Sequence, residues 1–262
     1  MGKTSCTIVT CYYRFPSKHS YAEYDAWAAR FLGAVETPMV IFCDAAGEAR
    51  LREMRGEREA RFVVLSLADT TCARLADWDA EHGRDPEADI HTTPLYVVWN
   101  EKSEFVRRAM EMNPFGTDAF AWCDVGCFRS DLNLSKFSRW PEGARLDASD
   151  EERLTLLCIQ PFEPRDLVVD ERTRLPRSFD NELRVGGTIM VGHRRAWERW
   201  IPAYYATLRR YIDVGMFAGK DQSVMASLVI LRPDLVTLFA PSHEPAHGDP
   251  WFFLQPLFSE VT

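Results

Sequence analysis

The 262-residue sequence lacks any apolar run of about 18 to 20 residues, the length that a helix needs to cross a bilayer. It also lacks the long apolar stretch of a signal peptide near its first residues. Its seven cysteines are odd in number and none shows Cys-x-x-Cys spacing, which disfavours a disulfide framework or a zinc site. We therefore expect reduced, buried thiols in a soluble cytoplasmic protein with no integral membrane segment.

A surplus of positive charge is missing as well. Lysine and arginine number 31 against 39 aspartates and glutamates, a net charge of −8, which makes nucleic acid an unexpected partner. Several catalytic motifs are absent: the Walker A loop, Gly-x-Gly-x-x-Gly after the first strand, Gly-x-Ser-x-Gly and His-Glu-x-x-His. These absences disfavour a kinase, an NAD dehydrogenase, a serine hydrolase and a zinc protease.

Short apolar runs alternate with helical patterns in the first half of the sequence. The runs predict strands at Thr7–Cys11, Met39–Cys43, Phe62–Leu65 and Phe120–Asp124. The amphipathic patterns predict helices at Tyr21–Leu32, Glu48–Arg58, Thr71–Glu81 and Leu95–Met112. Continuous apolar strands between helices are typical of a parallel sheet covered on both faces, so the first half is predicted to be Rossmann-like.

The second half begins with residues 129–182, which we expect to be loops around one short strand near Leu154–Ile159. Regular structure then returns, with strands at Val185–Val191 and Leu235–Phe239 and helices at Arg195–Tyr211 and Lys220–Leu231. The sequence shows no repeat, low-complexity tract or linker. A single domain over 1–262 is the simpler prediction.

Ligands of open parallel sheets bind beyond the carboxyl ends of the strands. Tyr12, Tyr13 and Arg14 follow the first predicted strand, Asp44 follows the second, and Asp124 ends the fourth. An aromatic side chain there is able to stack on a base, and a carboxylate to bind a ribose or a metal ion. Taken alone, each residue is better explained as an ordinary polar strand end.

Seven segments in the first half, taken in order, resemble one family. They are Thr7-Ile-Val-Thr-Cys-Tyr-Tyr, Ser17-Lys-His-Ser, Tyr24-x-x-Trp27, Pro38-Met-Val-Ile-Phe-x-Asp44, Leu95-Tyr-x-x-Trp-Asn-Glu-Lys102 with Phe105, Asn113-Pro-Phe, and Phe120-x-Trp-x-Asp-x-Gly-x-x-Arg129. Residues 5 to 141 are thereby similar to the HtrL/YibB (WlaTC-type) family, whose bacterial members are assigned as glycosyltransferases. Related domains occur in large algal viruses, which would place a viral member in the host cytoplasm.

The resemblance implies an α/β fold of the GT-A type, with a mixed central sheet. Residues 1–130 would form the nucleotide-sugar-binding half and residues 131–262 the acceptor half. Thr10 and Tyr12 would lie against the base, Asp44 near the base or ribose, and Arg14 among the donor-binding residues. Lys102 would approach the base or the phosphates; a solvated helix lysine beside Glu101 and Glu104 is the alternative.

Asp124 stands where most GT-A enzymes carry an Asp-x-Asp metal motif, but the third position here is Gly126. A divalent cation, Mn²⁺ or Mg²⁺, would offset the charge of the leaving diphosphate, because hard cations bind oxygen ligands. Arg129 would otherwise offset that charge.

The segments Arg184-Val-Gly-Gly-Thr-Ile-Met-Val-Gly192 and Gly219-Lys-Asp-Gln222 resemble the acceptor half of many GT-A enzymes. Gly186 and Gly187 would let the backbone pass close to the donor sugar. Asp221, beside Gln222, would accept a hydrogen bond from a sugar hydroxyl or take the proton of the acceptor. Its alternative is a helix N-cap.

The segment His243-Glu-Pro-Ala-His-Gly-Asp-Pro-Trp251 partly matches a metal-binding segment of family 8 glycosyltransferases. His243 or His247 would join Asp124 as a metal ligand, and solvated loop histidines are the alternative. Trp140 and Trp251 are predicted to stack on sugar, whereas the aromatic stripe from Trp197 to Tyr211 is predicted to lie in the core.

These observations predict a metal-dependent glycosyltransferase that moves a sugar from a nucleotide-diphosphate donor, with UDP the expected carrier, to a glycan or another hydroxyl acceptor. Asp221 is the predicted catalytic carboxylate. A second hypothesis is a non-catalytic protein that binds sugar nucleotides or glycans, since Gly126 replaces a carboxylate. A nucleotidyltransferase is a third, disfavoured because that reaction usually needs two carboxylates clustered on a metal pair.

Overall fold

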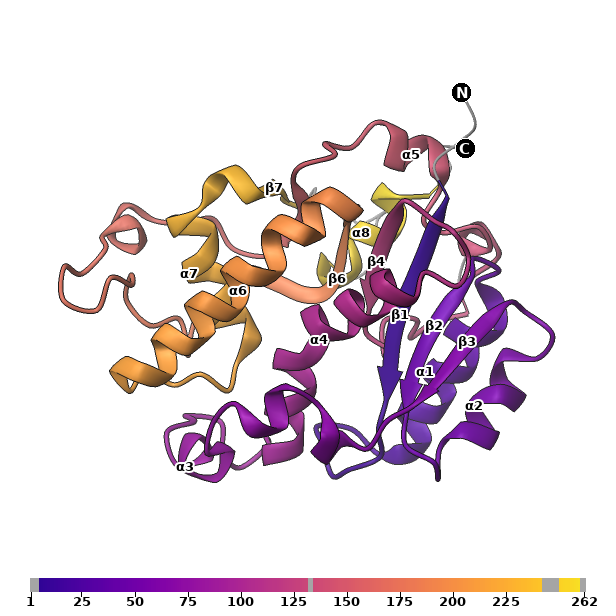
Figure 1. Cartoon of the computed structure of the whole chain (residues 1–262), viewed down its shortest axis with the longest axis horizontal. Helices are drawn as coiled ribbons and strands as arrows, with labels where there is room; N and C mark the ends of the chain where they lie inside the picture. Colours follow the sequence, from indigo (N-terminus) through magenta and orange to yellow (C-terminus); the bar gives the residue numbers. More distant parts are fainter. Residues whose placement is uncertain (1–4, 132–133, 242–249, 260–262) are drawn as a thin grey trace.

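A seven-stranded sheet lies at the centre of the computed structural model, which describes residues 5–131, 134–241 and 250–259 (Figure 1). The strands follow the order β3-β2-β1-β4-β6-β5-β7. Their bounds are β1 Cys6–Tyr12, β2 Met39–Cys43, β3 Ala60–Val64, β4 Ala119–Cys123, β5 Leu154–Cys158, β6 Val185–His193 and β7 Val236–Phe239. Strand β6 pairs antiparallel with β4 and β5, whereas the other described pairs are parallel.

Helices cover both faces of this sheet. Helices α4 (Thr93–Met112), α6 (Arg194–Val214) and α7 (Asp221–Leu231) pack on the face that carries Val9, Phe42 and Trp122. The other face, with Ile8 and Ile41, is covered by α1 (Tyr21–Ala34), α2 (Glu48–Arg55), α5 (Gly143–Asp147) and α8 (Leu254–Leu257). Because side chains alternate along a strand, consecutive residues such as Ile8 and Val9 supply opposite layers. Figure 1 shows α4 between the strands β1–β3 and the pair α6 and α7.

The predicted α/β fold class with a mixed central sheet is confirmed. The first four strands run parallel, as expected for the Rossmann-like half, and the reversed β6 joins β4 to the strands of the second half. The aromatic stripe of α6 is buried in the core as predicted, with Trp197, Trp200 and Tyr211 fully enclosed. Every cysteine is a free thiol, and Cys158 is the one that is only partly buried. No helix in the described ranges is long and apolar enough to cross a membrane.

Two predictions about this architecture are wrong. In place of the expected helix at Thr71–Glu81 lie one 3-10 turn, η2 (Cys72–Arg74), and the short helix α3 (Trp78–His82); another 3-10 turn, η1 (Leu67–Asp69), precedes them. The buried carboxylate of Glu101 accepts the backbone N–H groups of Thr71 and Cys72 at 3.1 and 2.7 Å, so a contact distant in sequence fixes this turn.

Trp140 is the second correction. Instead of forming a sugar platform it is fully buried, and its Nε1 donates to the carbonyl of Leu254 at 3.3 Å. Its ring meets the Phe128 ring edge to face in the same layer. The many prolines around residue 140 suggested an exposed loop, but the closing segment at α8 covers this tryptophan.

One buried arginine ties the outer helices to the strands. Arg55, at the end of α2, is fully enclosed and donates to four backbone carbonyls. Its Nη1 lies 3.1 Å from the oxygen of Leu32 and 2.5 Å from that of Val35, and its Nη2 lies 2.8 Å from those of Thr37 and Glu59. These carbonyls belong to the end of α1 and to the residues that precede β2 and β3. The guanidinium therefore satisfies carbonyls that water would not reach.

We expect Arg55→Met to lower the free energy of unfolding by about 3 kcal/mol, because several buried acceptors would lose a charged donor. The control is Arg52→Met on the same helix. Arg52 is mostly exposed, pairs with Glu48 at 2.7 Å and lies over the Phe62 ring, so its loss should cost about 1 kcal/mol or less. Urea denaturation of both variants measures the difference, and equal losses would contradict the role assigned to Arg55.

Candidate donor site at the carboxyl ends of the strands

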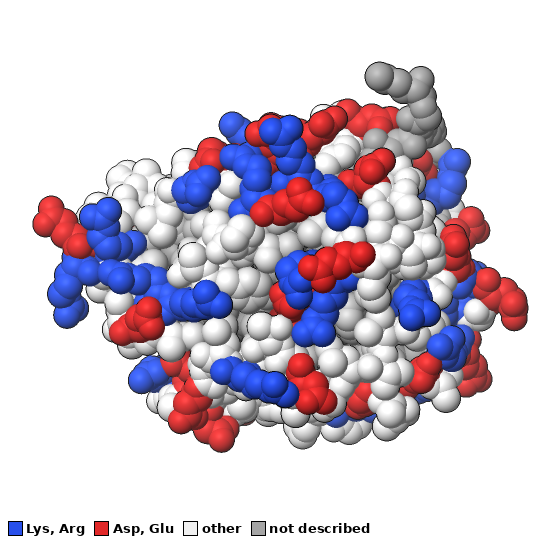
Figure 2. Space-filling view, viewed as in Figure 1, with Lys and Arg blue, Asp and Glu red and all other residues white. Residues whose placement is uncertain are grey.

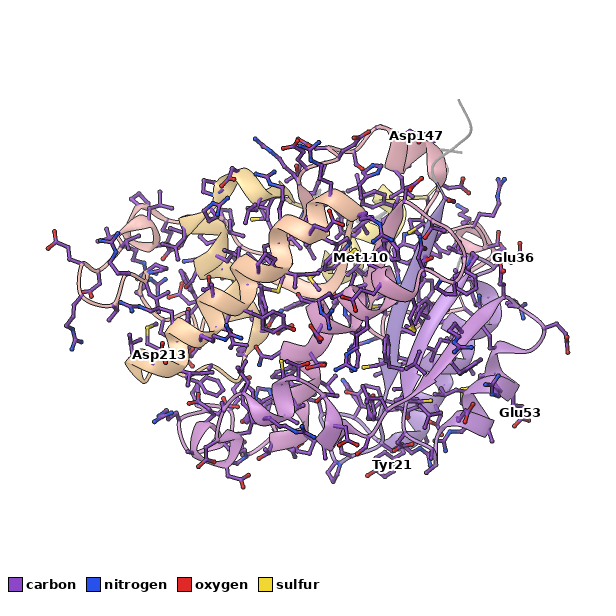
Figure 3. All side chains as sticks on the ribbon, viewed as in Figure 1. Tyr21, Glu36, Glu53, Met110, Asp147 and Asp213 are labelled. Atoms are coloured by element: carbon purple, nitrogen blue, oxygen red, sulfur yellow. The ribbon has the colours of Figure 1, made fainter. Side chains whose placement is uncertain are left out.

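An aromatic cavity opens where β1 and β4 end. Its walls include eight aromatic side chains: Tyr12, Tyr13, Phe15, Tyr21, Tyr24, Trp99, Trp122 and Phe252. Tyr12 ends β1 and Tyr13 follows it, Trp122 belongs to β4, and Trp99 comes from the second turn of α4. Figure 3 labels Tyr21, which lies at the lower edge of the molecule, the edge at which β1 ends. Flat apolar walls of this kind fit a planar ring such as a nucleobase.

A second, charged cavity adjoins the first. It is lined by three cations, Lys18, Lys102 and Arg129, and by the two carboxylates Asp124 and Asp221. Trp99, Asp124, Arg129, Thr188 and Phe252 line both cavities. One continuous depression therefore runs from an aromatic end to a charged end. On the outer face that Figure 2 presents, the lysine and arginine side chains (blue) are interspersed with those of aspartate and glutamate (red).

Lys102 is the centre of the charged cavity. Its ammonium is buried and lies 2.9 Å from Oδ2 of Asp221, 2.9 Å from the carbonyl oxygen of Gly187, and 3.2 and 3.3 Å from the two carboxylate oxygens of Asp124. These groups come from four elements: α4, the end of β4, β6 and α7. An ammonium has three N–H donors, and the three neighbouring residues supply acceptors for all of them.

The end of β4 holds Asp124 from several sides. Its backbone N–H donates to the carbonyl of Thr188 on β6 at 2.8 Å, so the strand pairing continues one residue past β4. The indole Nε1 of Trp122 donates to Oδ1 of Asp124 at 2.7 Å. The carbonyl of Asp124 then accepts the N–H of Cys127 at 3.0 Å and closes a turn. The carboxylate is thus fixed at the boundary of the two cavities.

Gly187 allows Asp221 to approach strand β6. A Cβ atom on Gly187 would lie 2.7 Å from Oδ2 of Asp221 and 3.3 Å from the sulfur of Met225. Asp221 is the first residue of α7, and its Oδ1 accepts the N–H of Gln222 at 2.9 Å. The N-cap position belongs to Lys220, so the carboxylate of Asp221 is directed at Lys102 rather than used as an N-cap.

The charges of this cluster stabilise one another. Burial lowers the pKa of Lys102, but Asp124 and Asp221 outweigh it and raise that pKa above its usual value. Burial raises the pKa of Asp124, Asp221 raises it further, and Lys102 opposes both. Two carboxylates and one ammonium therefore hold each other in a pocket where each alone would be costly.

The structure brings together six of the residues predicted from sequence: Tyr12 at the aromatic cavity and Lys102, Asp124, Gly187, Asp221 and Gln222 at the charged one. Trp251 also lines the charged cavity. The hydroxyl of Tyr12 donates to Asp25 at 2.7 Å. Burial is the larger cause and this hydrogen bond the second cause that raise the pKa of Tyr12 to about 12.

Four predicted donor-binding residues lie elsewhere. Thr10 is fully buried within β1. Arg14 forms an ion pair with Asp25 on α1. Asp44 accepts the N–H of Gly47 at 2.7 Å and so shapes the turn before α2. A Cβ on Gly186 would face Leu157 and Ile159, on the other side of β6 from Asp221.

The predicted metal site has to be judged from the described residues. His243 and His247 lie outside them. Within the described ranges, no three His, Cys, Asp or Glu side chains converge as metal ligands. Asp124 and Asp221 do approach one point, but the ammonium of Lys102 lies at that point and would repel a second cation. The described residues alone therefore do not fit a resident divalent ion.

Three residues of the site and its support, Lys18, Trp99 and Asn100, escaped the sequence reasoning although the quoted segments contain them. Lys18 belongs to Ser17-Lys-His-Ser, and its ammonium lies 5.5 Å from the ring centre of Trp99. Trp99 and Asn100 belong to the Trp-Asn-Glu-Lys run. The amide of Asn100 donates to the carbonyls of Ala218 and Gly219 at 3.2 Å and so positions the loop that leads to Asp221.

Comparisons with known proteins place the sequence in a family. The family described as "Bacterial protein of unknown function (HtrL_YibB)" matches residues 7–260. No curated protein matches the chain.

Solved structures that match include three with low identity. A glycosyltransferase involved in the glycosylation of the major capsid of PBCV-1 has 13% identity and a TM-score of 0.43, covering 91% of this chain and 81% of its own. The 4-diphosphocytidyl-2C-methyl-D-erythritol synthase of Anaerococcus prevotii has 9% identity and a TM-score of 0.44, covering 92% and 88%. The mannosyltransferase Ktr4p of S. cerevisiae has 8% identity and a TM-score of 0.48, covering 90% and 69%. Similarity at this level does not transfer an activity.

We expect Lys102→Met to lower the free energy of unfolding by about 3 kcal/mol near neutral pH, because two carboxylates would then face each other without a cation. Without the lysine, Asp221 raises the pKa of Asp124 further above the unfolded value of about 4. A raised carboxyl pKa stabilises the fold below the unfolded pKa, and this stabilisation is lost as the pH rises through the folded pKa. The loss relative to wild type should therefore be larger at about pH 7.5 than at about pH 5.

Urea denaturation at the two pH values measures this difference. Lys136→Met serves as the control, because Lys136 is an exposed lysine of the turn η3 (Leu134–Phe137). If Lys102→Met lowers the free energy of unfolding equally at both pH values, the charge of Lys102 is not what stabilises Asp124 and Asp221.

Proposed function

This chain belongs to the HtrL_YibB family, and we propose that it is a glycosyltransferase that moves a sugar from a nucleoside-diphosphate donor, expected to be UDP, to a hydroxyl group of a glycan acceptor. The observation that carries the proposal is the pair of adjoining cavities at the carboxyl ends of the strands. One has the flat aromatic walls that suit a base, and the other has the charges that suit a diphosphate and a sugar. The five shared residues make the pair a single elongated site.

The proposed reaction is a displacement at the anomeric carbon. The acceptor oxygen forms a bond to this carbon, and the bond from the carbon to the phosphate oxygen breaks. Its electron pair leaves with the nucleoside diphosphate, and the acceptor hydroxyl loses its proton. The protein has to fix the donor, offset the charge that grows on the diphosphate, and receive that proton.

Asp221 is the candidate for the last of these tasks. It lies in the charged cavity beside Gln222, Gly187 and Trp251, at the end away from the aromatic walls. The ammonium of Lys102, 2.9 Å away, holds this carboxylate in place by an ion pair. Contact with a hydroxyl of the donor sugar is the other role that this position permits.

In this proposal residues 1–130 bind the nucleotide, and residues 131–262 supply the acceptor side. Tyr12, Trp99, Trp122 and Asp124 come from the first segment, whereas Thr188, Asp221 and Trp251 come from the second. The Mn²⁺ or Mg²⁺ ion expected at Asp124, with His243 or His247, stays a prediction from sequence. If bound, it would add positive charge at the diphosphate.

The second candidate function is binding without catalysis. It is favoured by Gly126, which stands where a second carboxylate is expected. A Cβ there would lie 3.3 Å from the Trp27 ring and 3.6 Å from the Tyr24 ring, so a larger side chain would have to push into these aromatics. Such a protein would bind a sugar nucleotide and leave it intact.

We expect a nucleoside diphosphate to raise the melting temperature of the protein, because a ligand of the native state stabilises it by mass action. The screen compares UDP, GDP, TDP, ADP and CMP. Trp99→Ala should weaken binding of the preferred nucleotide by about tenfold or more, since stacking on one aromatic ring contributes about 1–3 kcal/mol. Phe239→Ala, which removes an exposed ring at the end of β7, is the control and should bind as the wild type does. A screen with no shift for any nucleotide would overturn the proposed function.

We expect Asp221→Asn to lower kcat for release of UDP from UDP-sugars by about a hundredfold or more, the usual contribution of a general base. The Kd for UDP should change little, because the base lies beyond the diphosphate. Asp213→Asn is the control; Asp213 is exposed near the end of α6, at the lower left of Figure 3. If wild-type protein binds UDP but releases it from no donor in a panel of UDP-sugars, the binding protein becomes the better description.

A further inference from the structure

Two cations of the charged cavity have no carboxylate partner among the described residues. They are Lys18, in the loop after β1, and Arg129, after the turn that follows β4. Neither forms a salt bridge with any aspartate or glutamate of residues 5–131, 134–241 or 250–259. Two cations in one depression, neither in a salt bridge with a described residue, are a feature that a bound anion would explain.

Aromatic rings hold both cations in place. The guanidinium of Arg129 lies 4.5 Å from the ring centre of Trp27 and 5.1 Å from that of Phe252, and its Nε donates to the carbonyl of Gly126 at 3.1 Å. The ammonium of Lys18 lies 5.5 Å from the ring centre of Trp99. Stacking restricts a side chain without using its outward N–H groups. Among the described residues, no carboxylate pairs with the terminal nitrogens of Arg129 or with the ammonium of Lys18, so both are placed to bind an anion.

Behind these two residues lies Lys102, whose charge is already shared by Asp124 and Asp221. The cavity therefore carries three cations and two carboxylates, a surplus of one positive charge. The surplus is provided by Lys18 and Arg129. A diphosphate that enters the cavity would meet these two side chains and would be repelled by the carboxylates if it displaced Lys102.

We propose that Lys18 and Arg129 bind the diphosphate of the donor, so that this protein binds its nucleotide without a divalent metal ion. The proposal rests on the proposed glycosyl transfer and goes beyond it, because it assigns the charge that a metal ion usually offsets to side chains of this chain. Lys102 takes the place between Asp124 and Asp221 and orients them. Arg129 is suited to the task because its fork of N–H groups matches two phosphate oxygens.

The positions of Arg129 and Lys18 also indicate how the donor would be oriented along the two cavities. Arg129 lines both cavities, whereas Lys18 lines only the charged one. A diphosphate between them would leave the nucleoside on the aromatic side and the sugar toward Asp221 and Gln222. The departing diphosphate, which keeps the electron pair of the broken bond, would remain between the two cations.

The test is calorimetric titration with UDP, uridine and inorganic pyrophosphate, each in EDTA and each with Mn²⁺. We expect UDP to bind with the same Kd, within about twofold, in both conditions. Lys18→Gln and Arg129→Gln should each weaken UDP binding by about tenfold, which corresponds to one charge-assisted hydrogen bond. Uridine should bind these variants as it binds the wild type, and pyrophosphate should lose affinity as UDP does.

Lys136→Gln is the matched control, since it removes an exposed lysine that lines neither cavity and should leave all three affinities unchanged. Circular dichroism melting confirms that each variant is folded. UDP binding that requires Mn²⁺ and is lost in Asp124→Asn would overturn this inference while the proposed transferase stands. Wild-type affinity of both glutamine variants for UDP would overturn it as well. Absence of binding by UDP, by uridine and by the other nucleotides would overturn the proposed function itself.

Discussion

The contact on which this site depends is the one between the ammonium of Lys102 and its three acceptors. Asp124 follows β4, Gly187 lies on β6 and Asp221 begins α7, so the ammonium joins the parallel half of the sheet to the reversed strand and to the helix beyond it. Such a contact requires a glycine at position 187, because any Cβ would collide with Asp221. It also requires α4 to cross the sheet so that Lys102 reaches the strand ends. Residues of four elements, α4, the end of β4, β6 and α7, are therefore arranged around one buried charge.

Most of the architecture could be predicted from the sequence because strands buried on both faces read as continuous apolar runs. The segment Met39–Cys43 was predicted with the bounds that β2 has, and the predicted ends of α4 and α6 differ from the observed ones by at most three residues. The failures have a common physical cause. At Thr71–Glu81 and at Trp140, a partner far along the chain decides the structure: Glu101 for the former and the α8 region for the latter. A local pattern holds no information about such partners.

For the site the sequence indicated which residues to consider but not how they pair. Asp124, Lys102 and Asp221 were each singled out, but for separate roles: a metal ligand, a contact to the base or phosphates, and the catalytic carboxylate. Only the three-dimensional arrangement shows that the lysine lies between them. Asp44 and Arg14 illustrate the converse, since a polar residue after a strand is as readily used to shape a turn or to pair with a neighbouring helix. Lys18 and Trp99 lay within the quoted segments, but their meeting across some eighty residues has no local signature.

An internal lysine and a metal ion place different demands on such a site. A bound divalent ion must be acquired from solution and needs several oxygen ligands, whereas a lysine is covalently present and orients the carboxylates before any ligand arrives. Its cost is that the ammonium uses its donors on Asp124, Asp221 and Gly187 and has none left for a phosphate. The charge on a diphosphate then has to be offset by cations whose donors remain available, and Lys18 and Arg129 meet that condition because aromatic rings, not carboxylates, position them. The division between an inner lysine that orients and outer cations that bind follows from counting donors and acceptors in this one cavity.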